Sequence, residues 1–154
     1  MKKTLTIILI IIWMTTIFIF SHQPSEESSN LSESFTTKIL KILNLYPENQ
    51  EQLDKIETVI RKLAHYFIYL IGGILIYTHL NLYNTKTGNK IAISQTIGSF
   101  YAISDEFHQT FVMGRSGEIR DVIIDSAGVI TGILIITLII KIRRKENNER
   151  IKTI

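Results

Sequence analysis

Side chains that could carry chemistry gather in three short groups, and each group borders a long apolar stretch of the chain. In chain order the ionisable groups are Arg61, Lys62 and His65, then Asp105, Glu106 and His108, then Arg120, Asp121 and Asp125; Gln109 shares a helix face with Asp105. Carboxylates and imidazoles can transfer protons or act as nucleophiles, and guanidinium groups bind phosphate in two-point geometry. These residue types are suited to binding an anionic ligand or to acid–base chemistry on it.

Helical spacing places the last group on one helix face. Asp125 lies four residues after Asp121, about 6 Å further along a helix axis. Gly128 and Gly132 continue this face as a stripe of small residues, which lets a second helix approach closely. We therefore expect Asp125 to face other helices and to lie near a cation. The cations that could pair with it are Arg61, Lys62 and Arg120.

Long apolar stretches dominate this chain of 154 residues, which is 45% hydrophobic and 20% charged, with a mean hydropathy of +0.20. A helix of about 20 residues crosses the hydrocarbon core of a bilayer. We predict an all-α membrane protein with a single domain over residues 1–154, built as a bundle of four transmembrane helices. The predicted spans are residues 4–20, 62–80, 91–107 and 120–141.

Basic residues set the expected orientation, because cytoplasmic segments of membrane proteins carry an excess of Lys and Arg. Lys2 and Lys3 precede the first span, Lys86 and Lys90 precede the third, and the tail 142–154 is rich in Lys and Arg. We therefore expect a multi-pass protein of the cell membrane with both termini in the cytoplasm. All three groups of ionisable residues would then lie at the outer end of the bundle.

Residues 21–60 would form the first outer loop. The loop starts with the polar, serine-rich residues 21–30, which we interpret as a linker. Apolar residues then recur at helical spacing from Leu31 to Tyr46, and again from Leu53 into the second span. These amphipathic helices would lie at the outer membrane surface, pack on the spans, or do both.

Several kinds of site are not expected. The chain has no Cys, and we find no Gly-rich phosphate loop, nucleophile elbow or zinc-protease motif. Asp105 and His108 have a spacing found in metal ligands, and His65 could join them, but Arg61 and Lys62 would repel a cation. We therefore expect no metal and no cofactor. The basic residues adjoin apolar stretches, which favours contact with lipid headgroups over nucleic acid.

Five short strings occur along the chain in a characteristic order. They are Phe20-Ser21-His22-Gln23, Arg61-Lys62-x-x-His65, Asp105-Glu106-Phe107-His108-Gln109, Gly114-Arg115-Ser116-Gly117 and Asp121-x-x-x-Asp125-x-x-Gly128-x-x-x-Gly132. Together they resemble the VanZ-like family of small multi-pass bacterial membrane proteins over roughly residues 10–140. One departure is Met113, which stands where the family pattern has Pro before the Gly-Arg pair.

The resemblance implies a role in lowering susceptibility to teicoplanin, a glycopeptide antibiotic with a fatty acyl tail, but implies no particular biochemical activity. It also marks a set of residues by their match to the family pattern. These residues are His22, Lys62, His65, Asp105, Glu106, Gln109, Arg115, Asp121 and Asp125.

Three classes of function are compatible with the ionisable residues. In the first, the protein binds the anionic headgroup of a membrane lipid or lipid-linked cell-wall intermediate at the outer leaflet. The binding residues would be Arg61, Lys62, His65, Asp105, Glu106, Gln109, Arg115, Arg120, Asp121 and Asp125. Binding is favoured because no catalytic motif stands out.

In the second class, the protein is an enzyme that modifies such a lipid. Asp105 or Glu106 would act as general base or nucleophile, and His65 or His108 as proton donor. In the third class, the charges only pair and hold the helices together. The near balance between cations and acids in and beside the three groups is compatible with that structural role.

Overall fold

The computed structural model describes residues 1–152, and among their side chains all but those of Glu27, Asn30 and Lys152. This part of the chain contains five helices and no strand. The helices are α1 (Lys2–Ser21), α2 (Ser25–Leu43), α3 (Gln50–Leu80), α4 (Thr87–Gln109) and α5 (Ile119–Lys152). The all-α class predicted from the sequence is confirmed.

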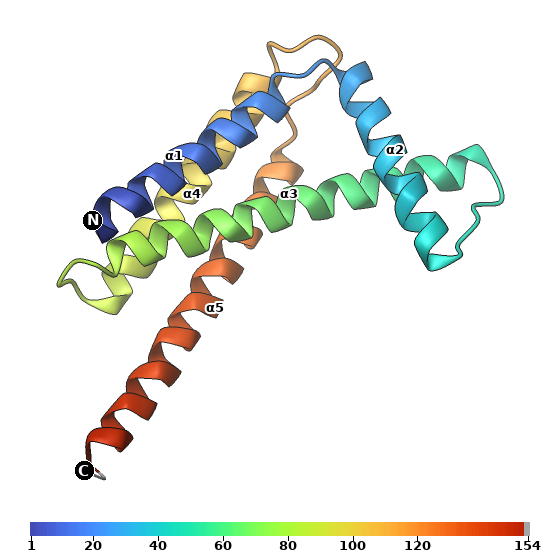
Figure 1. Ribbon diagram of the computed structural model, residues 1–154. Helices are drawn as coiled ribbons and strands as arrows, with labels where there is room; N and C mark the ends of the chain where they lie inside the picture. Colours follow the sequence, from blue (N-terminus) through green and yellow to red (C-terminus); the bar gives the residue numbers. More distant parts are fainter. Residues whose placement is uncertain (153–154) are drawn as a thin grey trace.

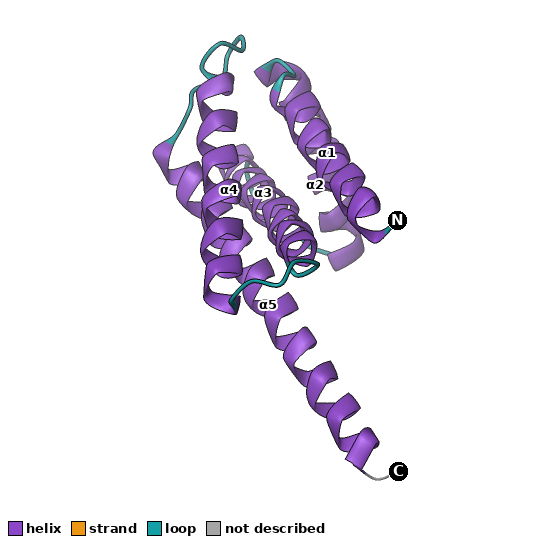
Figure 2. Cartoon of the chain, turned by 90° about the vertical axis from the view of Figure 1, so that its left-hand side faces the viewer, coloured by secondary structure: helices purple, strands orange, loops and turns teal. Residues whose placement is uncertain are grey.

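The long helix α3 lies at the centre of the structure and contacts each of the other four helices (Figure 1). Its most extensive contact is with α5. On another side α1 and α4 contact each other as well as α3. The C-terminal part of α5 extends away from the other helices (Figure 2), and residues 141–151 are exposed.

Glycines allow the backbones of α3 and α5 to touch. A Cβ atom at Gly128 would overlap the carbonyl oxygen of Tyr66, and one at Gly132 would overlap that of Leu70. In the opposite direction, a Cβ atom at Gly73 would overlap the Val129 carbonyl. The small-residue stripe of α5 therefore faces a second helix, as its spacing predicts.

Aromatic side chains join α1 to the other helices. The buried Trp13 packs edge-on against Tyr69 of α3 and also against Tyr101 of α4. Its indole N–H donates a hydrogen bond of 2.8 Å to the Ile68 carbonyl. The Tyr101 hydroxyl donates one of 2.6 Å to the Met14 carbonyl. Trp13 and Tyr101 therefore bury apolar area while the polar atom of each has a partner.

Three helices are long and apolar enough to cross a membrane, namely α1, α3 and the stretch Ile119–Ile151 of α5. These correspond to three of the four predicted spans. The third predicted span forms helix α4, but α4 is too polar to meet the same hydropathy requirement. Its polar residues Ser94, Asp105 and Glu106 are buried against the neighbouring helices.

The serine-rich segment is not a linker, because α2 begins at Ser25, directly after Pro24. Proline favours the start of a helix, where its missing N–H group has no intrahelical partner to lose. The helix ends at Leu43, and the capping residue Asn44 adopts a left-handed conformation with φ of 53°. Thr36 and Leu40 of α2 are buried and α2 contacts α3, so part of its amphipathic face packs within the protein.

The contact between α3 and α5 predicts a difference between two glycine substitutions. Gly132→Ala should destabilise the protein by about 1–3 kcal/mol because its Cβ would overlap the Leu70 backbone. Gly88→Ala should be neutral or slightly stabilising, since nothing lies within 4 Å of a Cβ there. Thermal unfolding of the purified protein in detergent measures both. Equal stability of the two variants would contradict this packing.

Candidate functional site

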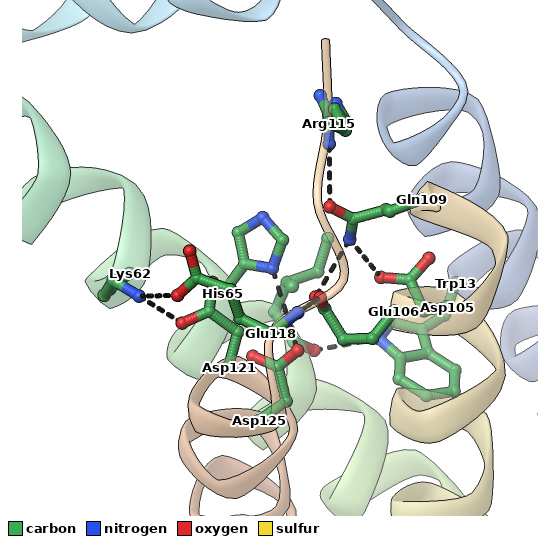
Figure 3. Close-up of polar contacts among 11 residues, drawn as sticks. Trp13, Lys62, His65, Asp105, Glu106, Gln109, Arg115, Glu118, Asp121 and Asp125 are labelled. Atoms are coloured by element: carbon green, nitrogen blue, oxygen red, sulfur yellow. Dashed lines mark hydrogen bonds and ion pairs between the residues drawn. The ribbon is translucent and has the colours of Figure 1, made fainter. Parts of the chain in front are cut away.

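Members of all three groups of ionisable residues meet at one end of the helix bundle: Lys62 and His65, Asp105 and Glu106, and Asp121 and Asp125 (Figure 3). This is where α4 ends, where α5 begins, and where α3 passes through the middle of its length. The connection between α4 and α5, residues 110–118, covers the same region and contributes Arg115 and Glu118. Residues far apart in the sequence therefore surround a common space.

Lys62 of α3 forms ion pairs with acidic residues at the start of α5 and just before it. Its ammonium group forms an ion pair with Asp121 and a second one, of 3.5 Å, with Glu118. Both partners are acidic, so the charge of Lys62 is already compensated. Lys62 is therefore less available to an external anion than the sequence predicts.

His65 lies beside Asp125. Its Nδ1 atom is 3.7 Å from a carboxylate oxygen of Asp125. Asp125 is 0% exposed, which confirms that this residue faces the helix bundle. The expected partners were wrong: Lys62 pairs with Asp121, one helical turn earlier in α5, and the side chains of Arg61 and Arg120 are exposed. The reason is the register of α3 against α5, which places His65 at the level of Asp125.

The buried carboxylates of α4 are held by a short chain of hydrogen bonds. The amide of Gln109 donates to Glu106 at 2.9 Å and to Asp105 at 3.3 Å. The second oxygen of Glu106 accepts the backbone N–H of Glu118 at 2.9 Å. These donors are neutral, so they orient the two carboxylates without compensating their charge.

Arg115 continues this chain towards α1. Its guanidinium donates to the side-chain oxygen of Gln109 at 3.3 Å and to the Phe20 carbonyl at 3.1 Å. Burial and the nearby Arg61 lower the pKa of the Arg115 guanidinium from its ordinary value, while Asp105 and Glu106 oppose this change. Because arginine has so high an ordinary pKa, the group stays protonated at neutral pH.

Four side chains that could bind a metal ion lie close together next to these contacts. One ligand atom from each of His65, Asp105, Glu106 and Asp125 lies within 4.8 Å of the others. We refer to these four residues as the carboxylate–histidine cluster. Such a set could share protons or coordinate a divalent cation.

A polar cavity of about 160 Å³ opens above the carboxylate–histidine cluster. It is lined by Ser25, Ser28, Arg61, Lys62, His65, Gln109, Gly114, Arg115, Ser116, Glu118, Asp121, Ile124 and Asp125. An apolar groove of about 430 Å³ adjoins it between α1, α2 and α3. The two share Ser28, Arg61, His65 and Arg115 as lining residues. A polar compartment and an apolar compartment thus have a common wall.

Two of the candidate residues lie elsewhere. Arg120 is exposed and lines neither the polar cavity nor the apolar groove. His108 turns towards α1, where its ring packs against Phe18 and lies 3.2 Å from a ring nitrogen of His22. His108 is therefore not part of the carboxylate–histidine cluster, although its neighbours in sequence are.

Sequence reasoning did not assign several residues that the structure places here. The side chain of Glu118 pairs with Lys62, and its backbone N–H donates a hydrogen bond to Glu106. The sequence feature that could have indicated Glu118 is its position one helical turn before Asp121. Tyr69 lies one helical turn beyond His65, and its buried hydroxyl has no hydrogen-bond partner among the described groups. Ser25 and Ser28 line the polar cavity, but a serine-rich stretch is not by itself specific enough to reveal such a role.

The sequence profile of the VanZ/LLP1 family matches residues 6–140. The matched segment includes all three groups of ionisable residues and the connection that carries Arg115. No curated protein and no solved structure matches the chain. The match covers most of the sequence, so the chain belongs to the VanZ/LLP1 family.

Proposed function

We propose that this membrane protein binds a lipid with an anionic headgroup, such as a lipid-linked cell-envelope precursor. The headgroup would occupy the polar cavity and the acyl chain would follow the apolar groove. The observation that carries the proposal is the wall shared by the two compartments, which contains Arg61, His65 and Arg115. A ligand with a charged end and an apolar end matches this arrangement.

Two arginines would hold the headgroup. Arg61 is exposed and forms no ion pair with any described carboxylate, so it is available to a ligand. Arg115 uses part of its guanidinium on Gln109 and Phe20, which fixes its position at the edge of the cavity. A guanidinium binds phosphate through two parallel hydrogen bonds, which makes arginine a specific phosphate ligand.

The apolar groove supplies the surface for a hydrocarbon chain. Its apolar lining comes from three helices and includes Ile17 and Phe20 of α1, Leu31 and Phe35 of α2, and Ile60 and Ile68 of α3. Leu31 is 54% exposed and Phe35 is 59% exposed. An acyl chain would cover these side chains and remove their apolar area from the surroundings, which is favourable.

We further propose that α4 is a fourth span and that the site faces the outer leaflet. With 23 residues α4 is about 34 Å long, enough to cross a bilayer core of about 30 Å. Its polar residues would be tolerated because they are buried against other helices. The basic residues Lys2, Lys3 and Lys86 lie towards the opposite end of these helices from the cavity, which favours a cytoplasmic location for both termini.

We also propose that the protein lowers susceptibility to glycopeptide antibiotics of the teicoplanin type. The support is membership of the family together with a site that would accept a lipid at the outer leaflet. Such a site could act on a lipid precursor of the wall or on a lipidated antibiotic, since both combine a polar group with an acyl chain.

A membrane enzyme that modifies the bound lipid is a second candidate function. Three buried carboxylates close to His65 favour it, because burial and crowding of such groups are common features of catalytic sites. Glu106 or Asp105 would then act as base or nucleophile, with His65 as proton donor. His108 is a weaker candidate because it contacts His22 instead.

Lipid retention tests the binding proposal. Protein purified in mild detergent should retain anionic lipids that mass spectrometry identifies, and Arg61→Ala should reduce the retained amount about tenfold or more. Arg115→Lys should also reduce it, because the charge stays but the two-point geometry is lost. Arg120→Ala is the matched control and should retain lipid like the wild type. Equal retention by all four proteins would contradict the proposal.

Cysteine labelling tests the orientation, and the natural chain has no cysteine to interfere. Single cysteines replace the exposed residues Glu48, Thr87 and Asn148 in separate variants. A membrane-impermeant maleimide should label only the first of them in intact cells, and all three after lysis. Labelling of position 148 in intact cells would rule out a cytoplasmic C-terminus.

Antibiotic protection tests the cellular role. Expression of the wild type should raise the inhibitory concentration of teicoplanin in a susceptible bacterium. Glu106→Gln and Arg115→Lys should abolish this increase while membrane abundance and thermal stability stay near the wild-type values. If each loss of protection follows a loss of folded protein, the charged residues serve packing alone.

A further inference from the structure

Asp125 is a buried carboxylate without a hydrogen-bond partner. It is 0% exposed, and neither of its oxygens accepts a hydrogen bond from any group that the structure describes. The nearest cationic candidate, Nδ1 of His65, is 3.7 Å away. A buried carboxylate in this state is costly unless a partner compensates its charge.

Asp105 and Glu106 add to this uncompensated charge. Among the described residues, no Lys or Arg forms an ion pair with either of them or with Asp125. Lys62 is occupied by Asp121 and Glu118, and Arg115 donates to an amide and a carbonyl. Three carboxylates therefore face a single histidine.

The spacing of the carboxylate–histidine cluster suits one small cation. Its ligand atoms lie within 4.8 Å of one another, and two ligands on opposite sides of a metal ion are about 4–4.4 Å apart. Only small movements of the side chains are needed to close the site. Because α3, α4 and α5 each contribute ligands, the packing of the helices brings them together.

We infer that His65, Asp105, Glu106 and Asp125 bind a divalent first-row transition-metal ion at the floor of the polar cavity. Carboxylate oxygens suit Mn²⁺, and an imidazole nitrogen favours transition metals over Mg²⁺ or Ca²⁺. The amide of Gln109 bonds to both α4 carboxylates and would orient them towards the ion.

This inference replaces the expectation that the site holds no metal. That expectation depended on repulsion by Arg61 and Lys62, but Lys62 is compensated by two acids and Arg61 is exposed. The sequence also indicated His108 as a possible metal ligand, whereas the structure places His108 against His22. The uncompensated charge of the carboxylate–histidine cluster attracts a cation.

A bound ion would also give the polar cavity a way to coordinate a phosphate headgroup. His65 and Asp125 line the polar cavity, so a metal held by them is accessible from it. On the proposed function, a phosphate oxygen of the headgroup completes the coordination of the ion while Arg61 and Arg115 hold the remaining oxygens. The metal site itself does not depend on that step.

Metal titration of the full-length protein tests the site. Protein in lipid-free detergent is treated with a chelator, and free Mn²⁺ is followed by electron paramagnetic resonance during titration. The wild type should bind one Mn²⁺ per chain. Asp125→Asn, which keeps the size of the side chain, should weaken binding about 100-fold or more, since loss of even a supporting residue costs about 10–100-fold. Glu146→Gln removes an acid from the exposed C-terminal part of the same helix, far from the cavity, and should leave the affinity unchanged.

Thermal unfolding separates loss of the metal from loss of the fold. Without metal, Asp125→Asn should be at least as stable as the wild type, because it removes an unpaired buried charge. Mn²⁺ should raise the unfolding temperature of the wild type and of Glu146→Gln, but not that of Asp125→Asn. The inference is overturned if the chelated wild type binds neither Mn²⁺ nor Zn²⁺ at millimolar concentration, or if Asp125→Asn binds as tightly as the wild type. Lipid retention is measured in a separate experiment. If the lipid proposal fails, the metal titration still shows whether the cluster binds a cation.

Discussion

The close contact between the backbones of α3 and α5 is the constraint on which the rest of the site depends. Gly128 and Gly132 leave room for the carbonyl groups of Tyr66 and Leu70, so the two helices approach without intervening side chains. This contact fixes the relative position of the helices along their axes. As a result, Lys62 meets Asp121 at one level, and His65 lies beside Asp125 at the next.

The charges of the site divide into an outer and an inner set. In the outer set, Lys62 compensates Asp121 and Glu118, which is what a role in packing alone would require. The inner set is different, because Asp105, Glu106 and Asp125 are buried and, among the described residues, form no ion pair with a Lys or an Arg. Packing alone does not explain why three carboxylates lie together without such an ion pair, whereas the cation proposed above, or a catalytic role, would explain it.

Helix α2 gives the site its apolar side. Its amphipathic sequence lets Thr36 and Leu40 pack within the protein while Leu31 and Phe35 face the groove beside α1 and α3. The groove meets the polar cavity at Arg61, His65 and Arg115. An amphiphilic ligand would therefore contact charged and apolar surfaces at the same time, and neither surface alone would select it.

The sequence by itself determined the helical class, three of the segments able to cross a membrane, the inward direction of Asp125 and the family. These properties follow from local periodicity and from motifs, which need no knowledge of neighbouring helices. Only the tertiary structure decided which residues meet. It paired Lys62 with Asp121, placed His65 beside Asp125, turned His108 towards His22, and left Arg120 exposed. Periodicity assigns a residue to a helix face, but its partner depends on the rotation and axial position of a second helix. Those are set by non-local contacts such as the glycine contacts between α3 and α5.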